Sequence, residues 1–336
     1  MLETRITKMF GIKYPILCGG MFWVGRAELI AAVANAGGLG FLTAATYPTI
    51  EELQEDIHKA KDLTDKPIGL NINLFAAVRA QPIERWVEVA IEEKIPVVET
   101  SGSTPKAIVS PLHAAGVKIM HKVPGVRYAQ SAERLGVDAV CVVGHEAGGH
   151  PGMDEVTTIV MVPAAVDAVN IPVVAGGGIG DGRGLVAALA LGADAVLMGT
   201  RFMATQECRG QAAFKEWMVH AAETETVYCM KSIMNPSRLA RNSVVEKVVE
   251  MERRGATLEE MLPLISRQGP AVVDTGNMED GLVSMGQAVG LVHDVPTCKE
   301  LIDRMVAEAE AAQQRLGAIF QPVSRAAGLD PSNFRS

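Results

Sequence analysis

The chain has 336 residues, of which 48% are hydrophobic and only 4% aromatic, and its formal net charge is −8. This length allows one large domain, or one domain with a smaller addition. The negative charge argues against nucleic acid or an anionic membrane surface as the main partner. No apolar run approaches the roughly 20 residues that a transmembrane helix needs, and the first residues form no apolar signal region. We therefore expect a cytoplasmic protein that acts on a small molecule.

The cysteines are five in number and scattered, and no pair has CxxC spacing. This distribution is typical of reduced thiols in a cytoplasm rather than of a disulfide framework. The residues concerned are Cys18, Cys141, Cys208, Cys229 and Cys298.

The first two hundred residues repeat one pattern, in which a short β-branched run is followed by a loop and an amphipathic helix. The expected strands are Tyr14–Cys18, Leu39–Thr43, Pro67–Asn73, Pro96–Thr100, Val117–Val123, Ala139–Val143, Ile171–Ala175 and Ala195–Thr200. The expected helices between them are Arg26–Ala36, Ile50–Leu63, Ile83–Glu93, Pro105–Ala115, Gly125–Leu135, Met161–Val169 and Asp181–Leu191. Strands that alternate with helices form parallel sheets, and eight such units predict an α/β fold with a closed (β/α)₈ (TIM) barrel over residues 1–205. A doubly wound open sheet is the alternative.

The repeating pattern stops after the eighth strand. Residues 206–268 contain helical patterns only, at Gln211–Glu223, Ser243–Arg254 and Leu258–Ile265. We interpret this stretch as a small helical insertion packed beside the top of the barrel. Residues 269–320 are expected to return to the barrel, with loops at Gly269-Pro270 and Gly276-Asn277 and a final helix over Cys298–Leu316; residues 321–336 form a polar tail.

The segment Gly144–Gly152 follows the sixth expected strand and contains four glycines and two histidines. Glycine allows the backbone to lie close against a ligand, and imidazole transfers protons near neutral pH. We interpret His150 as a general base or a hydrogen-bond donor, with a structural loop histidine as the alternative, and His145 as a supporting residue behind it. The two histidines are one residue too far apart for the zinc-binding helix motif, so we expect no metal.

Two further glycine-rich loops follow the seventh and eighth strands, at Gly176–Gly182 and Gly199–Arg201. In (β/α)₈ barrels, the loops after these two strands often bind a phosphate through backbone N–H groups. The pair therefore predicts a phosphate site.

The other strands end at the same opening of the barrel, called the mouth from here on, and these strand ends carry amides and one cation. Asn71, Asn73 and Lys122 suit a flat heteroaromatic ring, and a cation beside the N1–C2=O edge of a flavin would stabilise its anionic reduced form. For Lys122 the alternative is a salt bridge with Glu99. Met285 and Gln287, in the returning segment, are expected to cover the site, or else to pack as ordinary loop residues.

These segments together resemble the nitronate monooxygenase family, formerly called 2-nitropropane dioxygenases. The resemblance extends from about Arg5 to Leu316 and is carried by Gly19–Met21, Asn35–Gly40, Glu146–His150, Asp181–Gly184 and Met198–Phe202. It implies a barrel with non-covalent FMN, His150 as the catalytic residue, and oxidation of alkyl nitronates by O₂ to carbonyl compounds and nitrite. The FMN contacts expected from the strand ends and the resemblance are Gly20, Met21, Phe22, Asn71, Asn73, Lys122, Gly149, Gly176, Gly177, Gly178, Gly199, Thr200, Met285 and Gln287.

The family contains more than one activity. The segments Lys231–Asn242, Gly20–Arg26 and His121-Lys122 resemble a bacterial branch of NADH:quinone reductases, in which NADH is the co-substrate. The tyrosine-rich pocket of some nitronate oxidisers is missing, which brings the reductase close to the nitronate reaction as an expectation. A flavin enoyl-thioester reductase and a flavin-binding barrel without turnover are the remaining alternatives. Because helical insertions often mediate contacts between copies, a homodimer is compatible with this sequence.

Overall fold

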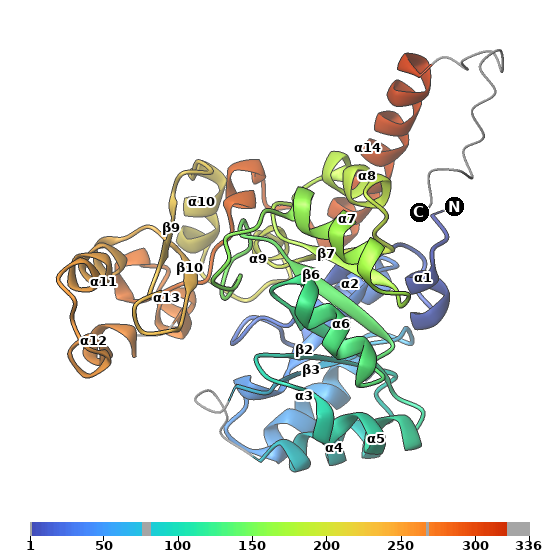
Figure 1. Cartoon of the computed structure of the whole chain (residues 1–336), viewed down its shortest axis with the longest axis horizontal. Coiled ribbons are helices and arrows are strands. Elements are labelled where there is room, and N and C mark those ends of the chain that lie inside the picture. The colour runs from blue at the N-terminus through green and yellow to red at the C-terminus, as the bar shows by residue number, and fades with distance from the viewer. Residues whose placement is uncertain (1, 76–81, 267–268, 321–336) are drawn as a thin grey trace.

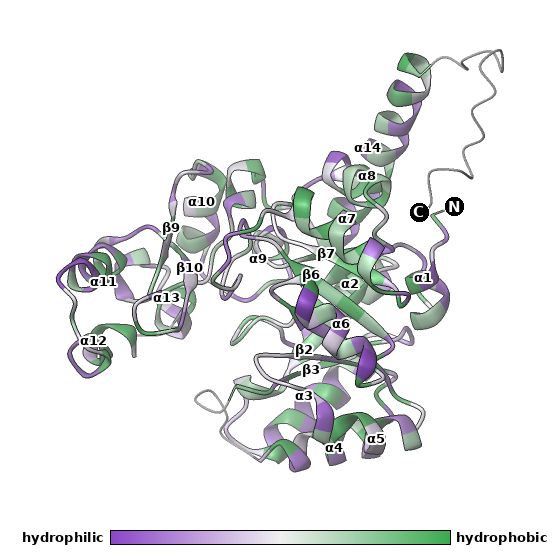
Figure 2. Cartoon of the chain, viewed as in Figure 1, coloured by the Kyte–Doolittle hydropathy of each residue, from purple (hydrophilic) through white to green (hydrophobic). Residues whose placement is uncertain are grey.

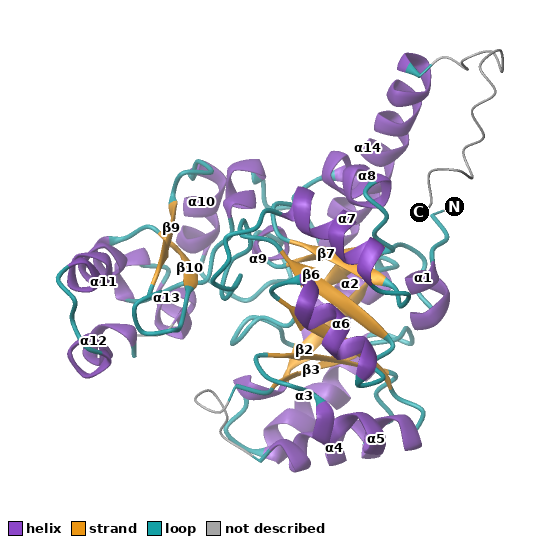
Figure 3. Ribbon diagram, in the orientation of Figure 1, coloured by secondary structure: helices purple, strands orange, loops and turns teal. Residues whose placement is uncertain are grey.

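The computed structural model describes residues 2–75, 82–266 and 269–320. Eight parallel strands close into a barrel in sequence order, with β1 hydrogen-bonded to both β2 and β8 (Figures 1 and 3). The strands are β1 Ile16–Cys18, β2 Leu39–Thr43, β3 Gly69–Asn73, β4 Val97–Ser101, β5 Lys118–Val123, β6 Ala139–Val143, β7 Val173–Gly176 and β8 Ala195–Met198. The prediction of a (β/α)₈ barrel is confirmed. An open doubly wound sheet is excluded because the first strand, β1, pairs with the last, β8.

Helices surround the strands on the outside of the barrel (Figure 3). They are α2 Ala27–Asn35, α3 Ile50–Leu63, α4 Ile83–Glu92, α5 Lys106–Ala114, α6 Val126–Arg134, α7 Thr158–Ala168 and α8 Gly182–Ala190, with a 3₁₀ turn, η1, at Ala44–Thr46. Each bound lies close to its predicted position. The largest difference is at α7, which begins three residues before the predicted Met161. The eighth strand ends two residues early, at Met198, and Thr200 already begins the short helix α9, Thr200–Met203.

Side chains of the barrel strands alternate between two apolar layers, as expected for strands covered on both sides. Leu17, Phe41, Met120 and Cys141 belong to a cluster inside the barrel. Their strand neighbours, such as Ile16, Leu42 and Val140, belong to the larger cluster between strands and helices. Figure 2 shows this layering as hydrophobic strands surrounded by helices with one polar face. The polar side chains Asn71, Glu99 and Lys122 occupy inward positions near the carboxyl ends.

A helix that the sequence pattern did not predict closes the amino-terminal end of the barrel. It is α1, Arg5–Phe10, and Thr4 starts it with a capping box. Ile6 and Phe10 join the inner cluster, and Arg5 is paired with Asp194 at 2.6 Å. With six residues, the helix is too short for its periodicity to be recognised.

The insertion forms a separate lobe beside the barrel, with its own apolar cluster (Figure 1). Its helices are α10 Ala212–His220, α11 Ser243–Arg253, α12 Leu258–Ile265 and α13 Gly269–Thr275. Two expectations for this region were wrong. The lobe is not helical only, because β9 (Thr226–Cys229) and β10 (Ser237–Ala240) form an antiparallel pair. Gly269-Pro270 begins a helix instead of a loop, which agrees with the tolerance for proline in a first helical turn.

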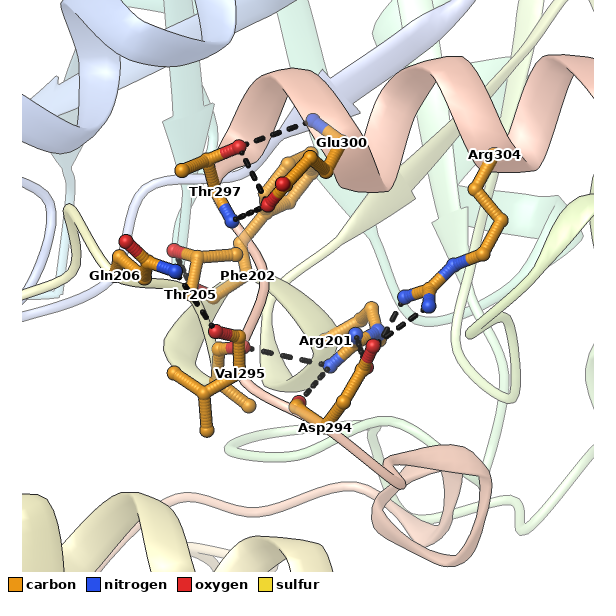
Figure 4. A network of polar contacts seen from close by, with 10 residues as sticks. Arg201, Phe202, Thr205, Gln206, Asp294, Val295, Thr297, Glu300 and Arg304 are labelled. Atoms are coloured by element: carbon orange, nitrogen blue, oxygen red, sulfur yellow. Dashed lines mark hydrogen bonds and ion pairs between the residues drawn. The ribbon is translucent and has the colours of Figure 1, made fainter.

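The returning segment contains the 3₁₀ turns η3 (Met278–Asp280) and η4 (Gln287–Leu291) and the final helix α14 (Cys298–Ile319). Helix α14 packs on α8 and α2 and then projects beyond the barrel (Figure 1). The buried Arg201 fixes the stretch between η4 and α14, because it is paired with Asp294 at 2.7 Å, and Asp294 is in turn paired with Arg304 at 2.6 Å (Figure 4). Within the described ranges, no helix is long and apolar enough to cross a membrane. The predicted tail, 321–336, lies outside the described residues.

Candidate active site

The loop after β6 is held in place by the insertion lobe. Gly149 donates a backbone hydrogen bond to Arg238 of β10 at 3.0 Å, and Arg238 returns one to Gly149 at 2.7 Å. The next residue of β10, Leu239, forms a similar bridge to Ser284 in the returning segment. The loop that carries His150 therefore pairs with β10 of the lobe through backbone hydrogen bonds, as a strand would.

Two loops at the carboxyl ends of the strands, after β6 and after β8, meet the returning segment at hydrogen-bonding or backbone contact distance. A Cβ on Gly148 would lie 2.7 Å from the backbone nitrogen of Gly286. Gly286 donates to Thr200 Oγ1 at 2.9 Å, and the Gln287 N–H donates to the Glu146 carbonyl at 2.9 Å. The expected convergence of the loops after β6 and β8 with residues 285–287 is thus present.

The loop after β7 has the backbone geometry of a glycine turn. Gly177 has φ +104° and Gly178 has φ +72°, values that side-chain-bearing residues rarely adopt. Gly178 is exposed, whereas a Cβ on Gly177 would lie 3.2 Å from the backbone nitrogen of Ala147. The loop consequently lies against the loop after β6.

The floor of the mouth contains one buried carboxylate with three donors around it. Glu99 on β4 has no exposed surface. Its Oε2 accepts hydrogen bonds from the Gly20 N–H at 2.9 Å and from Asn71 Nδ2 at 2.6 Å, and its Oε1 lies 3.1 Å from Lys122 Nζ. Adjacent strands supply these groups because Asn71 and Glu99 are register partners in the β3–β4 pair.

Lys122 has the salt bridge that was the alternative interpretation of its position. It forms the salt bridge with Glu99, and 21% of its side chain remains exposed at the mouth. Burial acts to lower the pKa of Lys122, but the attraction of the Glu99 carboxylate outweighs it and the pKa is raised. Lys122 is therefore a permanent cation at the floor.

His150 lies at the mouth with its ring against the insertion lobe. Its Nε2 is 2.9 Å from Oδ1 of Asn235, in the loop between β9 and β10. The residue keeps an exposed surface, yet the surrounding protein removes enough water to lower the pKa of the imidazole, against the opposing effect of the Asn235 hydrogen bond. His150 is therefore neutral at pH 7, and because Nε2 donates to Asn235, Nδ1 carries the lone pair.

His145 supports the loop from behind, as the sequence suggested. The Arg238 guanidinium donates to the His145 carbonyl at 2.8 Å and lies 2.6 Å from its Nε2. Tyr228 packs edge-on against the same imidazole and donates to the Gly152 carbonyl. Burial and the neighbouring Arg238 lower the pKa of His145.

Several residues singled out from the sequence have contacts or exposure that differ from those of the residues at the floor. Asn73 Oδ1 accepts from the Phe75 N–H at 2.8 Å, which stabilises the turn after β3. The Met285 side chain is completely buried in the outer apolar cluster, so only its backbone lies near the loops. Phe22 is exposed. His121 points away from the mouth, as expected, and contacts Thr100 at 2.7 Å.

Further residues predicted to contact the cofactor lie at or directly after the carboxyl ends of β1, β7 and β8. Met21 reaches the loop after β8, because a Cβ on Gly199 would lie 3.4 Å from its sulfur. Gly176 ends β7 and Thr200 begins α9.

Four residues of the mouth were not among the predicted contacts. Asn235, Arg238 and Tyr228 come from the lobe, whose packing against the loop has no local signal, although Asn235 and Arg238 lie inside the Lys231–Asn242 segment that carries the resemblance. The anchoring role of Glu99 also depends on contacts across strands.

A groove of about 790 Å³ between α8 and α14 is a separate feature. It is lined by residues such as Ala187, Leu301 and Arg315, lies on the outside of the barrel, and includes neither His150 nor Lys122. Its lining includes Gly180 and Asp181, at the end of the glycine-rich loop after β7.

Comparisons with known proteins identify the type of molecule. The family model "Nitronate monooxygenase" matches residues 3–308. A (3aS,4S,5R,7aS)-5-hydroxy-7a-methyl-1-oxo-octahydro-1H-indene-4-carboxyl-CoA dehydrogenase of Rhodococcus jostii is 34% identical over 95% of this chain and 99% of its own. A probable nitronate monooxygenase of Staphylococcus saprophyticus is 30% identical over 94% and 99%. The structure of FabK from Thermotoga maritima matches with a TM-score of 0.89 and 37% identity over 95% of this chain and 100% of that one.

A closed (β/α)₈ barrel with a histidine loop and a cationic floor at its carboxyl-terminal mouth defines a barrel enzyme. The chain belongs to the nitronate monooxygenase family. Membership makes it an oxidoreductase and implies a flavin cofactor.

Proposed function

We propose that the protein is an FMN-dependent oxidoreductase that oxidises alkyl nitronates with O₂ to carbonyl compounds and nitrite. The observation that carries the proposal is the neutral His150 on its glycine loop, facing the same mouth as the Lys122 cation. A base and a cation at one mouth suit a substrate that is an anion or becomes one when it loses a proton.

The residues at the mouth fit FMN. Lys122 has ammonium hydrogens to donate beyond its contact with Glu99, and Asn71 has a carbonyl oxygen to accept. Gly178 and Gly199 leave room for a phosphate beside the start of α9, since a Cβ on Gly199 would meet nothing nearer than the Met21 sulfur at 3.4 Å. We assign the isoalloxazine ring to Gly20, Asn71 and Lys122, and the phosphate to Gly178, Gly199 and Thr200. When bound, FMN supplies a two-electron acceptor.

His150 then has one of two roles. With a neutral nitroalkane, its Nδ1 lone pair takes the proton from the carbon next to the nitro group, and the ring becomes cationic. With a preformed nitronate, no proton has to move, and the imidazole only orients the anion. In both cases Asn235 holds the ring through Nε2.

A second candidate is oxidation or reduction of an acyl thioester. Four large apolar side chains remain exposed on segments around the mouth: Phe22 (44%), Phe75 (44%), Met153 (37%) and Met234 (74%). They follow β1, β3 and β6 or belong to the lobe loop that carries Asn235, and they suit a long apolar substrate. The 34% identity to a carboxyl-CoA dehydrogenase supports the same class.

The test is anaerobic mixing of the yellow protein with three donors separately: an alkyl nitronate, a saturated acyl-CoA and NADH. Bleaching of the visible spectrum by the nitronate alone supports the proposal. Bleaching by acyl-CoA alone favours the second candidate. Bleaching by NADH leads to two acceptors, a quinone and an enoyl-CoA: turnover with the quinone identifies an NADH:quinone reductase, and turnover with the enoyl-CoA a thioester reductase. Indifference to all three donors contradicts every one of these activities.

The phosphate assignment predicts that Gly199→Asp folds normally but loses FMN, because the new carboxylate repels the phosphate. Gly199→Ala, which fits the same space, is the matched control and keeps its flavin. Flavin content after gel filtration and the unfolding temperature check both. Gly199 is a better position for this test than Gly177, because the φ of +104° at Gly177 would strain the backbone of any residue with a side chain. Gly199→Asp with full flavin content would contradict the assignment.

A further inference from the structure

The fully buried Glu99 carboxylate has no part in the reaction proposed above, although it lies beneath the mouth. All three of its hydrogen-bond donors come from other strand ends: the Gly20 backbone after β1, Asn71 on β3 and Lys122 on β5. A carboxylate without access to water is costly unless it is paired. Its partners therefore show that it is ionised and that it contributes to the electrostatics of the floor.

The charge of Glu99 changes what Lys122 presents to a ligand. Gly20 and Asn71 are neutral donors, so Lys122, at 3.1 Å, is the only cation bonded to Glu99 within the part of the chain that the structure describes. At this distance, the carboxylate offsets part of the ammonium charge for any group lying above them. Lys122 thus offers hydrogen-bond donors with only part of the field of an isolated ammonium.

The same carboxylate determines which way the Asn71 amide faces. An ionised carboxylate can only accept hydrogen bonds, so Asn71 must turn its NH₂ group toward Glu99 Oε2, 2.6 Å away. The Asn71 carbonyl oxygen is then left as an acceptor. The floor presents a donor from Lys122 and an acceptor from Asn71, which matches the pyrimidine edge of a flavin, where an N–H lies between two carbonyl groups.

We propose that Glu99 is a positioning residue for the flavin, which fixes the Asn71 acceptor and holds the reduction potential below the value that Lys122 alone would give. The inference rests on the proposed function, since it requires a flavin above this floor. It adds a residue that controls how readily that flavin accepts electrons.

The experiment compares the two-electron midpoint potential of FMN in the wild-type chain and in Glu99→Gln. The amide removes the compensating charge, and the potential is expected to rise by about 30 mV or more, equivalent to tenfold tighter relative binding of the reduced form. The double variant Glu99→Gln/Lys122→Met loses both charges and is expected to return toward the wild-type potential. Glu93→Gln is the matched control, because Glu93 is also paired with a lysine, Lys61, at 2.7 Å, but precedes β4 at the opposite end of the barrel. It should leave the potential unchanged.

A purely structural role for Glu99 predicts weaker FMN binding or lower stability with an unchanged potential, and that result would overturn the inference while leaving the proposed function intact. If Glu99→Gln is insoluble, Glu99→Asp draws the carboxylate back by one methylene and should raise the potential in the same direction; no rise would again overturn the inference. A wild-type chain that takes up no FMN would overturn the proposed function together with the inference.

Discussion

At the scale of single residues, the protonation state of His150 depends on how the loop holds the ring. Desolvation lowers its pKa below the ordinary value of 6.5, and the Asn235 hydrogen bond opposes that shift. The free base is thus present at neutral pH, which a general base requires, and it is lost only when the pH falls through the lowered pKa.

His150→Gln is expected to reduce kcat/KM for a neutral nitroalkane by about 100-fold or more, the usual contribution of a general base. For the preformed nitronate the loss should stay within about tenfold, since that substrate has no proton to give up. Steady-state oxygen consumption with both substrates checks the difference. Equal losses for the two substrates would contradict the base role.

The pH profile of the same reaction tests the Asn235 contact. In the wild-type protein, kcat/KM for the nitroalkane should fall as the pH drops through a value below 6.5. Asn235→Leu removes the bond that favours the charged ring, so the apparent pKa should fall further. Asn170→Leu, an exposed residue at the opposite end of the barrel, should leave the profile in place.

At the scale of elements, the crossing of the loop after β6 with the returning segment leaves no space for side chains. Gly148 and Gly286 pass each other so closely that a Cβ on either would lie less than 3.0 Å from backbone atoms of the other segment. Backbone cannot move aside as a flexible side chain can. The two glycines therefore set the distance between the histidine loop and the start of η4.

Gly148→Ala should cost about 1–3 kcal/mol of unfolding free energy through overpacking and reduce turnover by displacing His150. Urea denaturation and activity assays measure the two effects. Gly317→Ala in α14 is the matched control, because its Cβ would meet nothing within 4 Å, and it should be neutral or slightly stabilising. A fully active Gly148→Ala protein would show that the crossing has more space than its contacts indicate.

The barrel was predictable from the sequence, whereas much of the site was not. Repeated short apolar runs such as Leu39–Thr43 and Ala139–Val143 were located to the residue, since buried parallel strands and their helices give a strong periodic signal. The hairpin of β9 and β10 was missed because strands of only four residues give almost no periodic signal in the sequence. Glu99 was expected only as a salt-bridge partner of Lys122, and Asn235 was not expected at the site, because their other contacts join segments far apart in the chain.

At the scale of the whole molecule, all five cysteines are free, and none is more than 2% exposed. They are distributed over all three apolar clusters of the molecule, so every part of the core contains at least one thiol. Burial raises the pKa of Cys141, Cys208 and Cys229 to about 12 each. The free thiols expected from their spacing are confirmed, and they are also unreactive by position and by charge state.

The native protein should therefore release no chromophore from a disulfide reagent such as DTNB at pH 8, and five equivalents should appear in guanidinium chloride. Ser103→Cys, on the exposed turn after β4, is the positive control and should react once in the native state. A wild-type thiol that reacts without denaturant would reveal local opening of the core around it.

The backbone bridge between Gly149 and Arg238 joins the barrel to the lobe, so the candidate site is built from two parts of the chain. The barrel alone supplies the floor with Lys122, Asn71 and Glu99, whereas the lobe supplies Asn235 and steadies the loop of His150. The lobe can therefore be altered to admit a different substrate without changing Lys122, Asn71 or Glu99, because these residues lie on the barrel strands. Relatives of similar identity whose names describe different substrates, a carboxyl-CoA and a nitronate, are the outcome that such a division allows.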